Sequence, residues 1–198
     1  MVEREILIRE ATPDDLNDIF CLYTNYMFDS HLLKFGRPFV EKYLKAILES
    51  KKCVTLVAVE SHIIGFIMAT FNCKNLFCGL FLNTGILLSW IRQVLIQPGT
   101  VFKTLRLALY PFHAGTKDVD AEFLFIAIEP GYRKRDIATE LIKRVLNLMR
   151  QNGIRKVKVS TVITNEAVNT LLKKLGFELR KTFELFKKHM YLYEYKLD

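Results

Sequence analysis

Three consecutive cations, Arg133, Lys134 and Arg135, stand where an apolar, alternating stretch gives way to a helical pattern. The stretch ends at Pro130, and the helical pattern starts at Ile137. Free backbone N–H groups and the helix dipole make a helix N-terminus a binding site for anions. The placement therefore predicts a phosphate or pyrophosphate ligand. The alternative is a solvated turn, which would set three cations against the positive end of the dipole.

Two common phosphate-binding signatures are missing from this turn. No Gly-Lys-Ser/Thr follows it, so it is not a P-loop, and no Gly-x-Gly-x-x-Gly marks a dinucleotide-binding turn. The anion must therefore be held by another arrangement of the backbone and the cations.

The elements around the cations predict a βαβ unit. We expect a strand over residues 121–128, a helix over 137–151 and a basic-apolar strand over 154–163. A crossover helix of this kind makes its two strands parallel, and we expect them to be adjacent in the sheet.

The remaining pattern mixes helices and strands. We expect strands at 4–10, 54–59 and 63–71, helices at 12–27, 39–50 and 166–174, and a final pair of strands that ends at Leu197.

The composition favours one domain over residues 1–198, since 51% of the residues are apolar and no linker or repeat interrupts them. The net charge of +8 indicates an anionic partner or a basic solvated surface. Cys21, Cys53, Cys73 and Cys78 fit no metal-ligand spacing, so we expect no metal. Their expected reduced state and a charged N-terminus without an apolar signal core favour a cytoplasmic protein.

Two motifs resemble the GNAT superfamily of N-acetyltransferases. The segment IAIEPGYRKRDIATELI, residues 126–142, resembles its acyl-CoA-binding motif, with Arg133 in the Arg/Gln position, Asp136 in the first Gly position and Ala138 in the Gly/Ala position. The segment NEAVNTLLKKLGF, residues 165–177, resembles its second signature of Asn, short helix and Leu-Gly-Phe. The order of elements over 4–197 is also similar, apart from the insert at about 72–119.

The resemblance implies an α/β (α+β) fold: a mixed, mostly antiparallel sheet with a central parallel pair and flanking helices, plus the helical insert. It implies acetyl-CoA as co-substrate, with Asn165 and the main chains of Ile126 and Ile128 as contacts. The backbone around the turn is expected to hold the pyrophosphate, through Arg133, Lys134, Arg135, Asp136, Ile137, Ala138 and Thr139. The two parallel strands must then diverge, to leave amides free for the pantetheine arm. Asn165 also has the place of a helix cap.

Asp136 departs from the family pattern. The Gly position favours a small residue, and Asp tolerates positive φ better than most. Its carboxylate could also cap the helix by accepting an N–H. The same carboxylate would repel a pyrophosphate, so either the flanking cations compensate or cofactor binding is weakened.

Acetyl transfer to an amine needs a base, because most amines are protonated at neutral pH. Glu122 is the candidate, since it lies on the strand of the expected cofactor contacts, where some family members carry a catalytic Glu. Alternation would place it on one face with Leu124, Ile126 and Ile128. The alternative is an exposed, inert acid at a strand end, and Asp118 and Asp120 are rivals.

A general acid is less evident. The family often has Tyr seven residues after the Asn, and here that position is Leu172. Three tyrosines of the last strand could substitute, although cross-strand packing suits them better: Tyr191, Tyr193 and Tyr195. The histidines look like surface or loop residues, and only His113 stands near a plausible acceptor pocket.

The insert is apolar and cationic, with no acidic residue from 73 to 116. Its pattern predicts two helices, at about 80–96 and 100–110. Three interpretations remain open: a lid over the acceptor pocket, a homodimer surface, or an interfacial membrane patch.

Three functions follow from these features. The first is an enzyme that transfers acetyl from acetyl-CoA to a primary amine of a small molecule, by direct attack on the thioester. The second is a non-catalytic CoA-binding module, which Leu172 and Asp136 favour. The third, a nucleic-acid binder, is disfavoured because few aromatic residues interleave with basic ones such as Arg155, Lys156 and Lys158.

Overall fold

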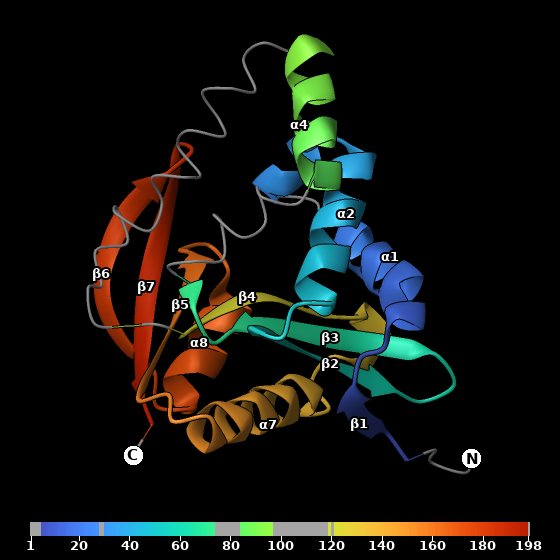
Figure 1. Cartoon of the computed structure of the whole chain (residues 1–198). Coiled ribbons are helices and arrows are strands. Elements are labelled where there is room, and N and C mark those ends of the chain that lie inside the picture. Colours follow the sequence, from blue (N-terminus) through green and yellow to red (C-terminus); the bar gives the residue numbers. More distant parts are fainter. Residues whose placement is uncertain (1–4, 28–29, 74–83, 97–118, 120, 198) are drawn as a thin grey trace.

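The computed structural model describes residues 5–27, 30–73, 84–96, 119 and 121–197 (Figure 1). Its strands are β1 (Leu7–Glu10), β2 (Cys53–Val59), β3 (Ile63–Thr70), β4 (Ala121–Ile128), β5 (Lys156–Val162), β6 (Glu178–Leu185) and β7 (Lys188–Lys196). Its α-helices are α1 (Leu16–Tyr26), α2 (Arg37–Leu48), α4 (Thr84–Ile96), α7 (Ile137–Gln151) and α8 (Glu166–Lys174). Short 3₁₀ turns are η1 (Pro13–Asp15), η2 (His31–Phe35) and η3 (Pro130–Tyr132).

The strands form one seven-stranded sheet in the order β1-β2-β3-β4-β5-β7-β6. The β4–β5 pair is parallel, and the other neighbouring pairs are antiparallel. The predicted βαβ unit is thus confirmed, with α7 as its crossover helix. The predicted fold class is confirmed as well.

Helices cover the two faces of the sheet (Figure 1). One core packs α7 and α8 against one face, and α7 contributes Leu141, Val145 and Met149, all fully buried. A second core packs α1 and α2 against the opposite face. The apolar residues of α7 recur at helical spacing and form one side of the helix, and burial of that side accounts for the position of α7 on the sheet.

The element boundaries differ slightly from the predicted ones. Helix α2 starts at Arg37, before the predicted residue 39, because Pro38 is accommodated in the first turn, where its missing N–H costs no bond. The turn η2 was not predicted. The predicted second helix of the insert, at about 100–110, lies outside the described residues.

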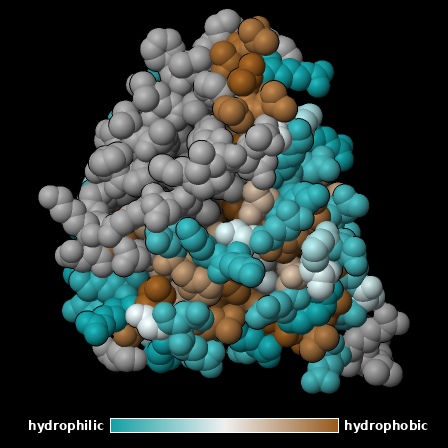
Figure 2. Space-filling view, in the orientation of Figure 1, coloured by the Kyte–Doolittle hydropathy of each residue, from teal (hydrophilic) through white to brown (hydrophobic). Residues whose placement is uncertain are grey.

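Helix α4 is the described part of the insert. Its N-terminal end rests on α2, where Lys42 Nζ donates to the Gly85 carbonyl at 3.2 Å and Ile86 is buried. Farther along, Leu88 and Leu95 are 65% and 78% exposed. Figure 2 shows an apolar group near the top, where Figure 1 has α4. None of the described helices is long and apolar enough to cross a membrane. The role of the insert stays a prediction.

A partly buried ion pair joins β1 to the start of α1. Arg9 Nη1 and Nη2 donate to the two carboxylate oxygens of Asp15 at 2.6 and 2.8 Å. The backbone N–H of Thr12 also donates to Asp15 at 2.7 Å. The Arg9 hydrogen bonds lower the pKa of Asp15 to about 2, against the opposing effect of burial. This pair fixes the start of α1, whose far end reaches the candidate site.

We expect Asp15→Asn to lower the free energy of unfolding at pH 7 by about 1–2 kcal/mol. The wild-type carboxylate stabilises the fold above its unfolded pKa of 3.8, and this stabilisation is lost as the pH falls toward about 2. Urea unfolding at pH 7 and between pH 4 and 2 would measure both effects. Asp14→Asn, at the exposed neighbouring position, is the control. Equal stability of the Asp15 variant and the wild type would contradict the assignment.

Candidate active site

The parallel strands β4 and β5 separate partway along their length. Their pairing runs from Ala121 and Val157 to Phe123 and Val159 and stops there. Both strands continue, β4 to Ile128 and β5 to Val162, each still paired to its antiparallel neighbour. The divergence expected from the sequence is therefore present, and it opens a gap on the β5 side of β4.

A β-bulge lies where the two strands part. Along β3, Met68 pairs with Phe125 and the adjacent Ala69 pairs with Phe123, so β4 has one extra residue, Leu124. The extra residue interrupts the alternation of faces. Ile126 and Ile128 consequently pack in the α7 core, whereas Leu124 packs in the α1–α2 core. The prediction that these three share one face with Glu122 was wrong, because alternation assumes an unbroken strand.

The separated strands border a cavity of about 570 Å³. Strand β4 lines it from Glu122 to Ile126, and β5 contributes Ser160, Thr161 and Val162. The end of α1, the start of η2 and helix α2 supply Tyr26, Met27, Ser30, Leu32 and Tyr43. The β6–β7 hairpin supplies Leu185, Phe186, Lys188 and Met190. This volume is within the range of small-molecule sites, which is about 300–1,000 Å³.

Glu122 lies at the inner end of the gap and is buried. Its side chain is 7% exposed, so the prediction of an exposed acid at a strand end does not hold. Its Oε2 lies 3.5 Å from the Nζ of Lys158, which is 2% exposed. The two residues face each other in the parallel register of β4 and β5. Glu122 is thus a buried carboxylate with a cationic neighbour, and it lines the cavity.

Tyrosines surround the carboxylate from the α1–α2 side. Burial, then the neighbouring Tyr23, Cys53 and Glu122, raise the pKa of Tyr43, so its phenol keeps its proton. Burial also raises the pKa of Tyr23, whose hydroxyl bonds to Ser30. The Tyr43 ring packs edge-on against Phe125, 6.3 Å between centroids. The cavity wall can therefore donate a phenolic hydrogen bond next to a carboxylate.

The turn before α7 has the backbone shape of an anion site. Lys134 and Asp136 have φ values of 63° and 55°, so the positive φ considered for Asp136 is confirmed. The Asp136 carbonyl accepts the Glu140 N–H at 2.9 Å, the first such bond into the helix. The N–H groups of residues 137–139 precede that bond and lack partners within the helix. Where left-handed residues alternate with residues of another backbone conformation, their successive N–H groups point into one concave surface.

The Asp136 carboxylate does not cap the helix as predicted. It makes no cap hydrogen bond to a backbone N–H and instead accepts the Thr139 hydroxyl at 3.4 Å. Cap geometry requires an extended backbone at the capping residue, and Asp136 is left-handed. Its charge is therefore exposed near the concavity.

The cations of the turn have different surroundings. Arg133 Nε donates to the Ile128 carbonyl at 3.0 Å, and its guanidinium lies 5.9 Å from the Tyr26 ring centroid. The Arg135 guanidinium lies 5.1 Å from the centroid of Tyr132. Arg133 therefore ties the turn to the end of β4, in addition to any role toward an anion.

Helix α8 closes the far end of β5. Asn165 caps it by accepting the Val168 N–H at 3.4 Å, as predicted, and it also lines the cavity. Asn169, buried and not singled out from the sequence, donates to the carbonyls of Val162 and Ile163 at 3.2 and 3.0 Å. These bonds hold the end of β5 away from β4.

Position 172 and the three tyrosines considered as substitute proton donors all make packing contacts. Leu172 is 1% exposed and packs in the α7 core, so this position has no proton donor. Tyr191 and Tyr193 pack edge-on, 5.9 Å between centroids, and Tyr195 packs on Phe177 at 5.0 Å. These contacts agree with the packing role preferred for the three tyrosines.

The other sequence candidates contribute little to the cavity. His62 is exposed and bonds to Glu129 at 2.9 Å. Asp118, Asp120 and His113 lie outside the described residues, as does the side chain of His31. Across the described parts of the chain, no three His, Cys, Asp or Glu side chains gather as metal ligands would.

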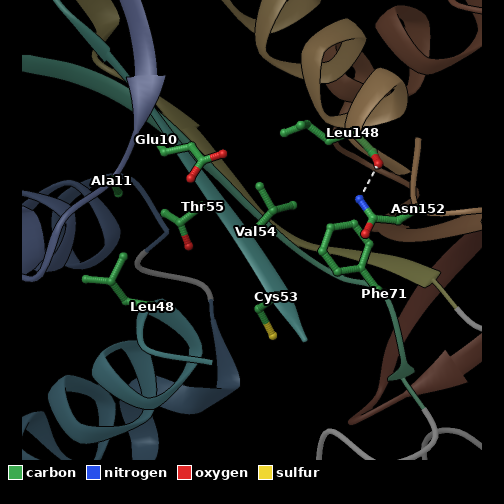
Figure 3. A pocket seen from close by; sticks show the side chains of 9 residues that line it. All are labelled: Glu10, Ala11, Leu48, Cys53, Val54, Thr55, Phe71, Leu148 and Asn152. Atoms are coloured by element: carbon green, nitrogen blue, oxygen red, sulfur yellow. Dashed lines mark hydrogen bonds between the residues drawn. The ribbon is translucent and has the colours of Figure 1, made fainter. Parts of the chain in front are cut away.

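A second, smaller hollow lies where β1 ends beside β2 (Figure 3). It holds about 220 Å³, and Glu10, Thr55 and Asn152 are among its lining residues. Burial raises the pKa of its Cys53, which favours the unreactive thiol. No predicted site residue lines it, so the chemistry belongs to the larger cavity.

Several residues of the cavity and its surroundings were missed from the sequence. Lys158 was grouped with surface basic residues, because a Lys between two valines reads as the wet face of a strand. Tyr43 looked like an ordinary core residue of an amphipathic helix. The hairpin residues Phe186 and Lys188 carry no motif. Only the position of the strand partners could have identified Lys158.

A parallel strand pair that diverges, with a turn shaped like an anion site at one end and a buried carboxylate at the other, is the arrangement that the resemblance to acetyltransferases implied. The chain belongs to the acetyltransferase (GNAT) family, whose family model matches residues 16–177. The resemblance inferred from the two motifs is confirmed.

Particular relatives extend this finding. An uncharacterised N-acetyltransferase of Schizosaccharomyces pombe is 36% identical over 79 residues, which are 40% of this chain and 42% of that protein. An N-acetyltransferase structure from Staphylococcus aureus Mu50 has a TM-score of 0.65 at 18% identity, covering 98% of this chain and 99% of the other. The structure of Arabidopsis thaliana NAA60 in complex with acetyl-CoA has a TM-score of 0.63 at 15% identity, covering 98% and 99%.

We expect Asn169→Ala to lower the free energy of unfolding by about 1–3 kcal/mol, because two carbonyls at the end of β5 lose their donor. Thr170→Ala, at an exposed position of the same helix, is the matched control and should change stability little. Chemical denaturation of both variants measures the difference. A loss no larger than that of the control would show that these bonds do not hold the strand end.

Proposed function

We propose that this chain transfers an acetyl group from acetyl-CoA to a primary amine of a small molecule. The observation that carries the proposal is the gap between β4 and β5, with the buried carboxylate of Glu122 at its inner end and the turn at 133–139 at its outer end. Acetyl-CoA carries its thioester on a long arm that has phosphates at the other end. It fits such a site, because the thioester can lie near the carboxylate and the phosphates near the turn.

The residues of the gap fit the two parts of the cofactor. The main chain of β4 beyond Phe123 has no β5 partner, so it can pair with the amides of a pantetheine arm. In this assignment Ile126 and Ile128 contribute main-chain groups, although the Ile128 carbonyl already accepts a hydrogen bond from Arg133.

The left-handed Lys134 and Asp136 turn backbone N–H groups toward the pyrophosphate. The side chains of Lys134 and Arg135 add positive charge, and Ile137, Ala138 and Thr139 add helix N–H groups. Asn165 contacts the arm from α8.

Acetyl-CoA supplies the activated acetyl group, which a neutral amine attacks directly. Glu122 lines the cavity and accepts the proton that the amine must lose. A free N–H of β4 near the bulge donates to the oxygen on which charge develops. The Tyr43 phenol, which remains protonated, donates a hydrogen bond toward the same region. No side chain at position 172 protonates the leaving thiolate, and a thiolate leaves without that help.

The acceptor is proposed to be small because the cavity is enclosed on several sides. Segments from α1, η2 and α2 and the β6–β7 hairpin border the same 570 Å³ as the strands. We further propose a cytoplasmic location, supported by the free thiols of Cys21, Cys53 and Cys73.

We expect Glu122→Gln to lower kcat by about 100-fold or more, because the amide cannot accept a proton. The dissociation constant for acetyl-CoA, measured by calorimetry, should change less than threefold. Thiol release with a panel of amino sugars, amino-acid derivatives, polyamines and peptide N-termini would identify the acceptor and measure kcat. Glu49→Gln, at the exposed C-cap of α2, is the control.

Three results would revise this proposal. Undiminished turnover in Glu122→Gln would remove Glu122 from the base role. Turnover of peptides alone would replace the small acceptor. Tight acetyl-CoA binding with no turnover on any amine would favour the non-catalytic CoA-binding module.

We expect Asp136→Gly and Asp136→Asn both to tighten acetyl-CoA binding, by about fivefold at low salt, because a negative charge beside the pyrophosphate is removed. Both residues tolerate the left-handed backbone. Calorimetry at low and high salt measures the effect, which should shrink as salt screens the charge. Unchanged or weaker binding in both variants would show that the carboxylate does not oppose the cofactor.

A further inference from the structure

Lys158 is a charged residue in a place where lysines are seldom found. Its side chain is 2% exposed, in the middle of a strand between the buried Val157 and Val159. The Glu122 carboxylate lies 3.5 Å from Nζ and is itself almost fully buried. Two opposite charges therefore lie side by side in the interior of the sheet.

The pair continues into a row of alternating charges across the sheet. On the other side of Lys158, the register of β5 and β7 places Glu194 opposite it. Glu194 Oε2 accepts Arg180 Nε at 2.9 Å, and Arg180 also reaches Glu178 at 2.9 Å. Glu194 thus stands in the register between the buried Lys158 and the Arg180 guanidinium.

Among the described residues, the other titratable groups on this side of the sheet carry no positive charge. The Glu122 carboxylate acts electrostatically on Tyr43 of α2, as do Tyr23 of α1 and Cys53 of β2. Burial raises the pKa of all three, so each is uncharged at neutral pH. Thr70, the register partner of Glu122 on β3, has no charge. A buried carboxyl that loses a neighbouring cation retains its proton to higher pH.

We propose that Lys158 is a positioning residue that keeps the Glu122 carboxylate ionised and directed at the cavity. Lys158 does not line the cavity and acts through Glu122. The inference rests on the proposed role of Glu122 as the base. A carboxyl that arrives protonated cannot accept a proton from the amine, so the ion pair would set the lowest pH at which the site works.

The test is a titration of Glu122 by NMR in protein labelled with 13C at the glutamate carboxyl, with Glu122→Gln assigning the signal. In the wild type the midpoint is expected below pH 5 despite the burial. In Lys158→Met it should rise by at least one pH unit, and Lys158→Arg, which keeps the charge, should restore it. This readout needs no acceptor, so it stays informative if the proposed function fails.

A second variant, expected to shift the Glu122 midpoint in the opposite direction, keeps the test decisive if Lys158→Met does not fold. Glu194→Gln keeps Lys158 but removes its second carboxylate, so the Glu122 midpoint should fall slightly. A wild-type midpoint above pH 6, or one unmoved by Lys158→Met, would overturn the proposal.

The kinetic counterpart is the acidic limb of the kcat/KM profile. In Lys158→Met this limb should move upward with the NMR midpoint, so a shift of one pH unit lowers activity about tenfold more at a pH below both midpoints than at pH 9. A merely structural role would lower activity equally at both pH values. An active Glu122→Gln enzyme with a shifted NMR midpoint would separate failure of the base role from failure of this inference.

Discussion

The parting of β4 and β5 is the constraint on which the rest of the site depends. Two parallel strands that share one sheet lose hydrogen bonds when they separate, and each unpaired backbone group needs another partner. Here β5 keeps β7, β4 keeps β3, and α8 holds the end of β5 through Asn169. The remaining open groups of β4 border the cavity. A ligand with amides of its own would satisfy them, as the proposed acyl-CoA does.

The same parting explains why a charge pair can lie inside the sheet. Glu122 and Lys158 occupy the last stretch in which the strands are still paired, so the register brings them together at the edge of the gap. Breaking such a buried pair is costly, whereas replacing both ions together often is not. Its retention here is therefore weak evidence for stability and better evidence for a task at the cavity.

The outer end of the gap follows a different physical rule. It depends on backbone shape more than on side chains, because the left-handed Lys134 and Asp136 orient the N–H groups. Arg133 donates to the Ile128 carbonyl, and the Arg135 guanidinium lies over the Tyr132 ring. Asp136 takes the conformation that glycine would take, at the cost of a charge. The turn therefore combines a favourable backbone with an unfavourable carboxylate.

The sequence by itself determined the features that local pattern encodes. The βαβ unit, the turn before α7, the Asn165 cap and the family followed from periodicity and short motifs, since these involve residues near one another in the chain. Tertiary structure alone decided the bulge at Leu124, the burial of Glu122 and its pairing with Lys158. Glu122 and Lys158 are 36 positions apart, the bulge depends on Met68 of β3, 57 positions before Phe125, and strand register sets both. Periodicity specifies which face a residue prefers, but not which partner stands beside it.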